Sequence, residues 1–133
     1  MGAWGSGAFE NDGAMDFVQE VTDGSGLKRI ESALAAVLKS KSEYLEAPEA
    51  EEGLAASAML AEILNPAAEQ ELVPLEVSAW ASNADKPLAE IVEKARQVVL
   101  RVLTPPSELL ELWTESEDFE NWKSGVEAIG ARL

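Results

Sequence analysis

Four carboxylates near the start of the chain have a spacing that could hold a metal ion. Asp12, Asp16 and Glu20 follow one another at intervals of four residues, which places them along one side of a helix, and Glu10 lies just before them. Carboxylate oxygens are the ligands that Mg²⁺ and Ca²⁺ prefer. We interpret these acids as residues that favour the positive end and the solvated face of an amphipathic helix. The alternative is a metal-binding domain or a Mg²⁺- or Ca²⁺-dependent enzyme that uses these four carboxylates.

The residue types that the sequence lacks exclude several other kinds of chemistry. The 133 residues include no Cys and no His. Thiol catalysis, iron–sulfur clusters, zinc–thiolate sites and imidazole-based triads are therefore excluded. We expect no cofactor, and we favour a protein that is not an enzyme.

The net charge of −15, from 25 acidic and 10 basic residues, favours a basic protein as the partner. Nucleic acids and anionic membranes bind clustered Lys and Arg, so neither is an expected partner. A charge of this size can also serve solubility alone. No long apolar run and no secretory signal pattern occur, and we expect a cytoplasmic protein.

Two segments contain many acids and no Lys or Arg. The first acidic stretch, residues 43–52, holds five acids, and the second acidic stretch, residues 108–120, holds six. Charge runs of this kind are most often solvated faces. The candidates for partner contact are two aromatic residues and four acids of the second stretch: Trp4, Phe9, Glu115, Glu117, Asp118 and Glu120.

Apolar residues recur at helical spacing along most of the chain and predict an all-α fold. We expect one compact domain, residues 1–133, with six or seven mostly short helices. Residues 54–64 are apolar nearly all round, which predicts a central helix packed on several sides. The predicted N-terminal caps of the other helices are Asn11 or Asp12, Ser25, Asp85, Ser107 and Ser116.

The first nine residues combine glycines with aromatic side chains, which is unusual for a helix or for a disordered arm. We predict that Gly2, Gly5 and Gly7 let the backbone lie close against the helices while Trp4 and Phe9 are buried.

This opening run resembles the signature of a bacterial family, domain-of-unknown-function family 4259. The residues that carry the resemblance are Gly2-Ala3-Trp4-Gly5-x-Gly7-x-Phe9-x-Asn11-Asp12-x-Ala14-x-Asp16-Phe17. Later segments are also similar to that family: Leu72-x-Pro74 with Trp80, Ser107-Glu108-Leu109-x-Glu111-Leu112-Trp113, and Asp118-Phe119-x-x-Trp122. The resemblance implies a small bacterial cytoplasmic protein and supplies no catalytic residues.

We interpret the chain as a small acidic protein that acts by binding another protein. An immunity-type protein that covers a basic toxin domain is one concrete form of this hypothesis, motivated by size and charge.

Overall fold

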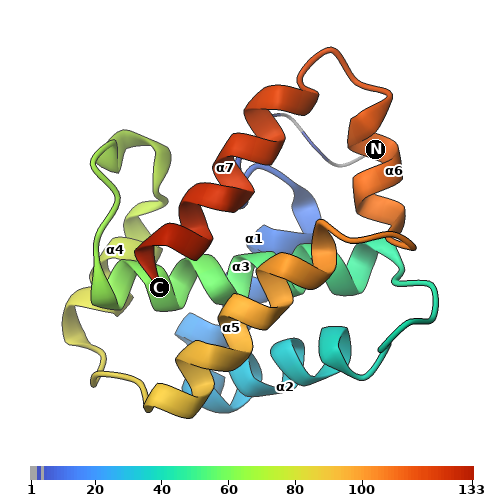
Figure 1. Cartoon of the computed structure of the whole chain (residues 1–133). Helices are drawn as coiled ribbons and strands as arrows, with labels where there is room; N and C mark the ends of the chain where they lie inside the picture. Colours follow the sequence, from blue (N-terminus) through green and yellow to red (C-terminus); the bar gives the residue numbers. More distant parts are fainter. Residues whose placement is uncertain (1–2, 4) are drawn as a thin grey trace.

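Helices form most of the chain in the computed structural model, which describes residue 3 and residues 5–133 (Figure 1). The described part contains seven α-helices and no strand, which confirms the predicted all-α fold. The helices are α1 (Asp12–Glu20), α2 (Gly26–Leu38), α3 (Ala47–Leu64), α4 (Leu75–Asn83), α5 (Ala89–Val102), α6 (Glu108–Thr114) and α7 (Phe119–Arg132). All seven contribute buried residues to one hydrophobic core, so they form one domain. None of the described helices is long and apolar enough to cross a bilayer.

Helix α3 is the centre of the fold, as its apolar pattern predicted. Residues 53–62 are all buried, and the helix packs against α1, α2, α5 and α7. In Figure 1 it runs through the middle of the molecule, with α2 below it and α7 above it. Gly53 lies close against α2 and α5: a Cβ there would lie 2.5 Å from Val37 Cγ2 and 3.1 Å from Val98 Cγ1. Only a residue without a side chain fits between these valines.

Two of the predicted helix caps are confirmed. The side chain of Asn11 accepts a hydrogen bond from the Ala14 N–H at 2.8 Å, and Ser107 accepts one from the Leu110 N–H at 3.4 Å. Both residues satisfy backbone donors that the first turn of a helix leaves free.

Two other predicted caps are wrong, and a third is correct in position only. Helix α5 begins at Ala89, four residues after Asp85, because the residue before Pro87 is biased towards extended backbone. The Ser116 hydroxyl accepts from the Asp118 N–H at 3.0 Å, before α7 begins. Ser25 lies at the N-cap position of α2 but makes no capping hydrogen bond, since a π-type turn with a positive φ at Gly24 joins α1 to α2.

The N-terminal segment is held by Phe9 and by a carboxylate. Phe9 is 8% exposed and belongs to the core, which confirms its predicted burial, whereas Trp4 lies outside the described residues. The Glu10 carboxylate accepts a hydrogen bond from the Gly7 N–H at 3.0 Å. A Cβ on Gly5 would lie 2.5 Å from the same carboxylate. Gly5 and Gly7 therefore leave room for the Glu10 side chain, a reason that the sequence did not suggest.

Candidate functional site

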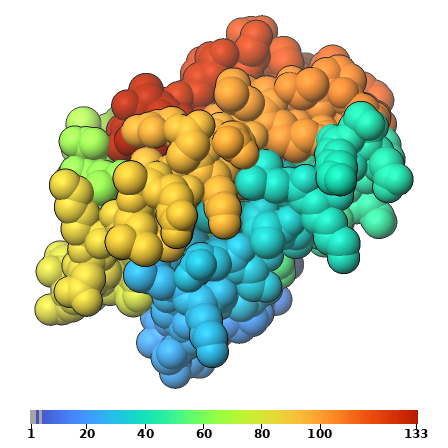
Figure 2. Space-filling model, turned by 60° about the horizontal axis from the view of Figure 1, so that its bottom comes forward, coloured from blue at the N-terminus to red at the C-terminus, as the bar shows by residue number. Residues whose placement is uncertain are grey.

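The fold brings the two acidic stretches side by side. Leu45 and Ser107 form an isolated parallel bridge, in which the Leu45 N–H donates to the Pro106 carbonyl at 3.2 Å and the Glu108 N–H donates to the Leu45 carbonyl at 2.9 Å. Figure 2 shows the teal segment that contains the first stretch against the orange segment that leads into the second. Segments separated by about sixty residues in the sequence thus share one edge of the molecule.

Side chains of the second stretch reinforce this contact. The Glu108 carboxylate accepts from the Ala47 N–H at 2.8 Å, in the first turn of α3, where the helix dipole favours a negative charge. The Tyr44 hydroxyl donates to the Glu111 carboxylate at 3.1 Å. We call the carboxylates of the two stretches the acidic face. Four of its members lie on the loop between α6 and α7 or at the start of α7, and all four are exposed. They are the predicted contact residues Glu115, Glu117, Asp118 and Glu120.

Two arginines lie at the border of the acidic face. Arg29 pairs with Glu52 at 2.9 Å and with Glu20 at 2.8 Å. Arg101 donates instead to four backbone carbonyl oxygens, those of Lys41, Glu43, Thr104 and Pro106, at 2.6–2.9 Å. It therefore holds together the two loops that place the acidic stretches.

A hollow of about 480 Å³ opens within the acidic face, between the start of α3, α6 and the loop before α7. We call it the α3–α6 groove. Its lining is Ala3, Gly5, Ala47, Pro48, Glu51, Leu109, Leu112, Trp113, Ser116 and Asp118. Leu112 is 52% exposed beside it, and Trp113 stacks on the buried Trp122 with ring centroids 6.0 Å apart. The groove therefore combines an apolar wall with carboxylates and contains no Lys or Arg among its described lining residues.

Glu51 lies in the groove among other acids. Burial raises the pKa of its carboxyl above the ordinary value, and the negative charges of Asp12 and Glu108 raise it further. Gly13 gives this side chain room, because a Cβ there would lie 3.0 Å from Glu51 Oε1. A cation placed here would relieve the repulsion among the three carboxylates.

The four metal candidates have different surroundings. Glu10 accepts a backbone hydrogen bond in the glycine-rich arm, and Glu20 pairs with an arginine of α2. Asp12 and Asp16 are exposed on α1. Within residue 3 and residues 5–133, no three acids lie in an arrangement that could hold a metal ion. The metal site stays a prediction without geometric support.

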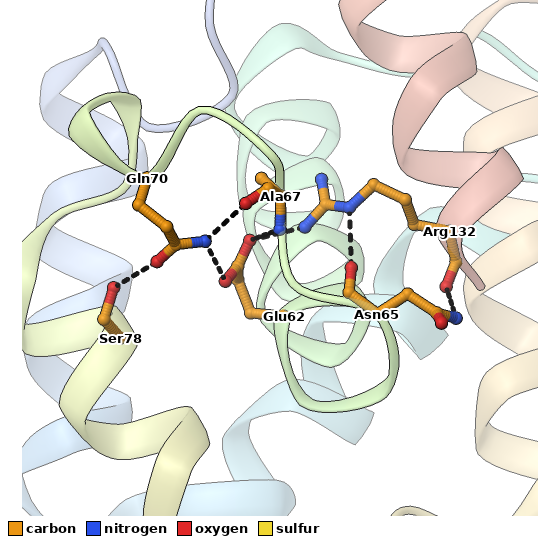
Figure 3. Close-up of polar contacts among 6 residues, drawn as sticks. All are labelled: Glu62, Asn65, Ala67, Gln70, Ser78 and Arg132. Carbon is orange, nitrogen blue, oxygen red and sulfur yellow. Dashed lines mark hydrogen bonds and ion pairs between the residues drawn. The ribbon is translucent and has the colours of Figure 1, made fainter.

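A second polar arrangement lies at the other end of α3 (Figure 3). The side chain of Glu62 is 3% exposed, and its carboxylate pairs with the Arg132 guanidinium. It also accepts from the Ala67 N–H at 2.9 Å and from Gln70 Nε2 at 3.3 Å. Arg132 in turn donates to the Asn65 carbonyl at 3.0 Å. The arrangement ties the C-terminal turn of α7 to the end of α3 and to the loop that leads to α4.

Comparison with known proteins places the chain in a family. Residues 2–125 match the family described as Domain of unknown function (DUF4259). This chain is a member of DUF4259. The match confirms the resemblance carried by the N-terminal run. No curated protein and no solved structure matches the chain.

The sequence of this DUF4259 member does not by itself reveal the roles of Glu62, Arg101, Arg132 and Glu51. One signal was available, because Glu62 is the only charged residue in the apolar run of residues 54–64. A buried charge of this kind requires a partner, but the sequence does not identify that partner. Arg132 lies beyond the matched residues 2–125, whereas Glu62 and both acidic stretches lie within them.

Proposed function

We propose that this DUF4259 member is a non-enzymatic protein-binding module whose partner is basic. The acidic face carries the proposal, since two stretches without Lys or Arg meet on one edge of the molecule. Carboxylates gathered in this way raise the association rate with a positively charged partner and disfavour acidic ones. An immunity-type protein that covers a basic toxin domain is one form that this function can take.

The residue types support binding rather than catalysis. His and Cys are absent from the sequence, and the buried carboxylate of Glu62 is fully engaged by the arginine, amide and backbone donors around it. Four acids on the acidic face are exposed on the loop between α6 and α7 and at the start of α7, where a partner can reach them. Exposed charges of this kind contribute to long-range attraction.

Two charge-matched variants test this proposal. The first neutralises the exposed acids of the face through Glu115→Gln, Glu117→Gln, Asp118→Asn and Glu120→Gln. The control neutralises four exposed acids elsewhere through Glu31→Gln, Glu71→Gln, Glu76→Gln and Glu90→Gln. Both change the net charge from −15 to −11.

Each protein is immobilised and exposed to an extract of the source cell at salt from about 50 to about 500 mM, and retained proteins are identified by mass spectrometry. We expect the unmodified chain and the control variant to retain a basic protein at low salt and to release it at high salt. The face variant should retain much less. Retention that is insensitive to salt, equal loss in both variants, or no retained basic protein would contradict the proposal.

A further inference from the structure

We propose that the α3–α6 groove binds one apolar side chain from a basic segment of the partner, with Lys or Arg residues of that segment contacting the surrounding carboxylates. This inference rests on the proposed function and names the point of contact. It commits to one occupant, a short cationic segment with an apolar anchor.

The shape and lining of the groove fit an apolar anchor. Its volume of about 480 Å³ falls within the range of roughly 300–1,000 Å³ that is typical of ligand pockets. Pro48, Leu109, Leu112 and Trp113 form its apolar part. Covering the exposed Leu112 would remove apolar surface from water, which favours association.

The main aromatic wall is held in place before binding. Trp113 stacks on Trp122 with an interplanar angle of 8°, and Trp122 is 3% exposed. The Phe119 ring also contacts Trp122, with centroids 6.2 Å apart. A side chain that is already ordered loses little conformational freedom on binding, and tryptophan is enriched among residues that contribute strongly to interfaces.

The charges around the groove select the sign of the flanking residues. Glu51 and Asp118 belong to the lining, and Glu51 is further influenced by the nearby charges of Asp12 and Glu108. An acidic segment would increase this repulsion, whereas an ammonium or guanidinium group would relieve it. The charges therefore favour a cationic segment over a neutral or acidic one.

Two other hollows in the described part of the chain lack this combination. The hollow between α5 and α7, about 330 Å³, is lined by both Arg96 and Glu127. The hollow beside α4, about 560 Å³, is lined by Ser78, Ser82 and Lys86 as well as by Glu62, which is already paired. Neither presents an apolar wall with carboxylates alone.

The test uses two synthetic Lys-rich peptides of equal charge, one with a central Leu and one with Ser in its place. A third peptide carries Glu in place of every Lys. Each is labelled with a fluorophore, and its binding to the intact protein is followed by fluorescence anisotropy at low salt. We expect the Leu peptide to bind about tenfold more tightly than the Ser peptide, and the Glu peptide not to bind.

A matched pair of variants locates the contact. Leu112→Gln removes the exposed apolar side chain beside the groove, and Leu100→Gln makes the same change on α5, where Leu100 is 65% exposed. We expect Leu112→Gln to abolish the preference for the Leu peptide and Leu100→Gln to keep it. Circular dichroism and melting temperature verify that both variants are folded.

The possible failures are distinguishable. Equal affinity for the Leu and Ser peptides, or equal effects of Leu112→Gln and Leu100→Gln, would contradict the proposal that the groove binds an apolar anchor. The proposal of a basic partner would still stand. No binding of either Lys-rich peptide at low salt would count against both. A dimer in sedimentation experiments that dissociates on Leu112→Gln would show that a second copy of the chain occupies the groove, and would also overturn the inference.

Discussion

The carboxylate of Glu62 is buried at the end of α3 and pairs with the guanidinium of Arg132, 70 residues later in the chain. Removing one member of a buried ion pair leaves the other charge without compensation. We expect Arg132→Met to lower the free energy of unfolding by about 3 kcal/mol, measured by urea denaturation. The exposed pair of Arg96 and Glu93 provides the control, and Arg96→Met should change stability by less than about 1 kcal/mol. If Arg132→Met and Arg96→Met lowered the free energy of unfolding equally, the burial of Glu62 would not explain the contribution of its ion pair to stability.

Two glycines should respond to alanine in opposite directions. At Gly53 a Cβ would clash with Val37 and Val98, so Gly53→Ala should lower the free energy of unfolding by about 2 kcal/mol. At Gly125, within α7, nothing lies within 4 Å of the added atom, and Gly125→Ala should raise it by about 0.5–1 kcal/mol through helix propensity. Thermal denaturation of the two variants gives the comparison, and a stabilising Gly53→Ala would contradict the close packing of α3.

Arg101 should be needed to position the acidic face. Lysine cannot reproduce a guanidinium that donates to four carbonyl oxygens, so Arg101→Lys should cost about 2 kcal/mol of stability. Hydrogen exchange of the Leu45 and Glu108 amides, which form the bridge between the two stretches, should become faster. Unchanged exchange at these two amides would contradict the positioning role.

The stability of the protein should depend on pH through Glu51. Its folded-state pKa is raised above the ordinary 4.5 by burial and by Asp12 and Glu108, so the folded state holds this proton more tightly than the unfolded chain does. Glu51 therefore lowers the free energy of unfolding as pH rises from 4.5 through the raised pKa, and contributes nothing below that window.

Glu51→Gln should accordingly stabilise the protein at neutral pH, by no more than about 1 kcal/mol because solvent screens this half-exposed carboxyl. The gain should vanish in acid. Urea denaturation at several pH values measures it, with the exposed Glu31→Gln as the matched control. A gain that is the same at every pH, or that appears equally for Glu31→Gln, would not come from Glu51 titration.

Phe9 should anchor the glycine-rich arm. Because Phe9 is only 8% exposed and belongs to the core, Phe9→Ala should lower the free energy of unfolding by about 3 kcal/mol. Leu72→Ala removes a side chain that is 61% exposed and should change it by less than about 0.5 kcal/mol. Chemical denaturation that gives equal values for the two would show that the arm does not contribute to the core.

Periodicity was sufficient for helices such as α2, α5 and α7 because their apolar residues repeat every three or four positions, whereas α3 was predicted from a continuous apolar run. The spacing predicts one buried stripe of Leu88, Ile91, Val92, Ala95, Val98, Val99, Val102 and Leu103. Its members from Ile91 to Val102 are buried, whereas Leu88 lies just before α5 and is 63% exposed. The start of α5 was misplaced because Asp85 is a good capping residue by type, while the local restriction before Pro87 keeps the chain extended. The first residue of a helix depends on which of two competing local preferences is stronger. Residue types alone do not show which one that is.

The sequence predicted the two stretches of the acidic face separately, without showing that they meet. The sequence identified both acidic stretches and the four exposed acids of the second stretch, but their meeting depends on the Leu45–Ser107 bridge and on the contacts of Arg101. The bridge and the bonds from Arg101 to Lys41 and Glu43 join residues about sixty positions apart, and no local pattern encodes such a distance.

By itself, the amino-acid sequence determined the fold class, the family, the absence of imidazole and thiol chemistry, and the excess of negative charge, since all of these depend on residue type and short-range spacing. Only the tertiary structure decided that Glu62 meets Arg132, that Gly53 lies between Val37 and Val98, and that an apolar groove opens among carboxylates. The physical reason is that burial and charge pairing depend on which distant segments pack together, and that packing is a property of the whole chain.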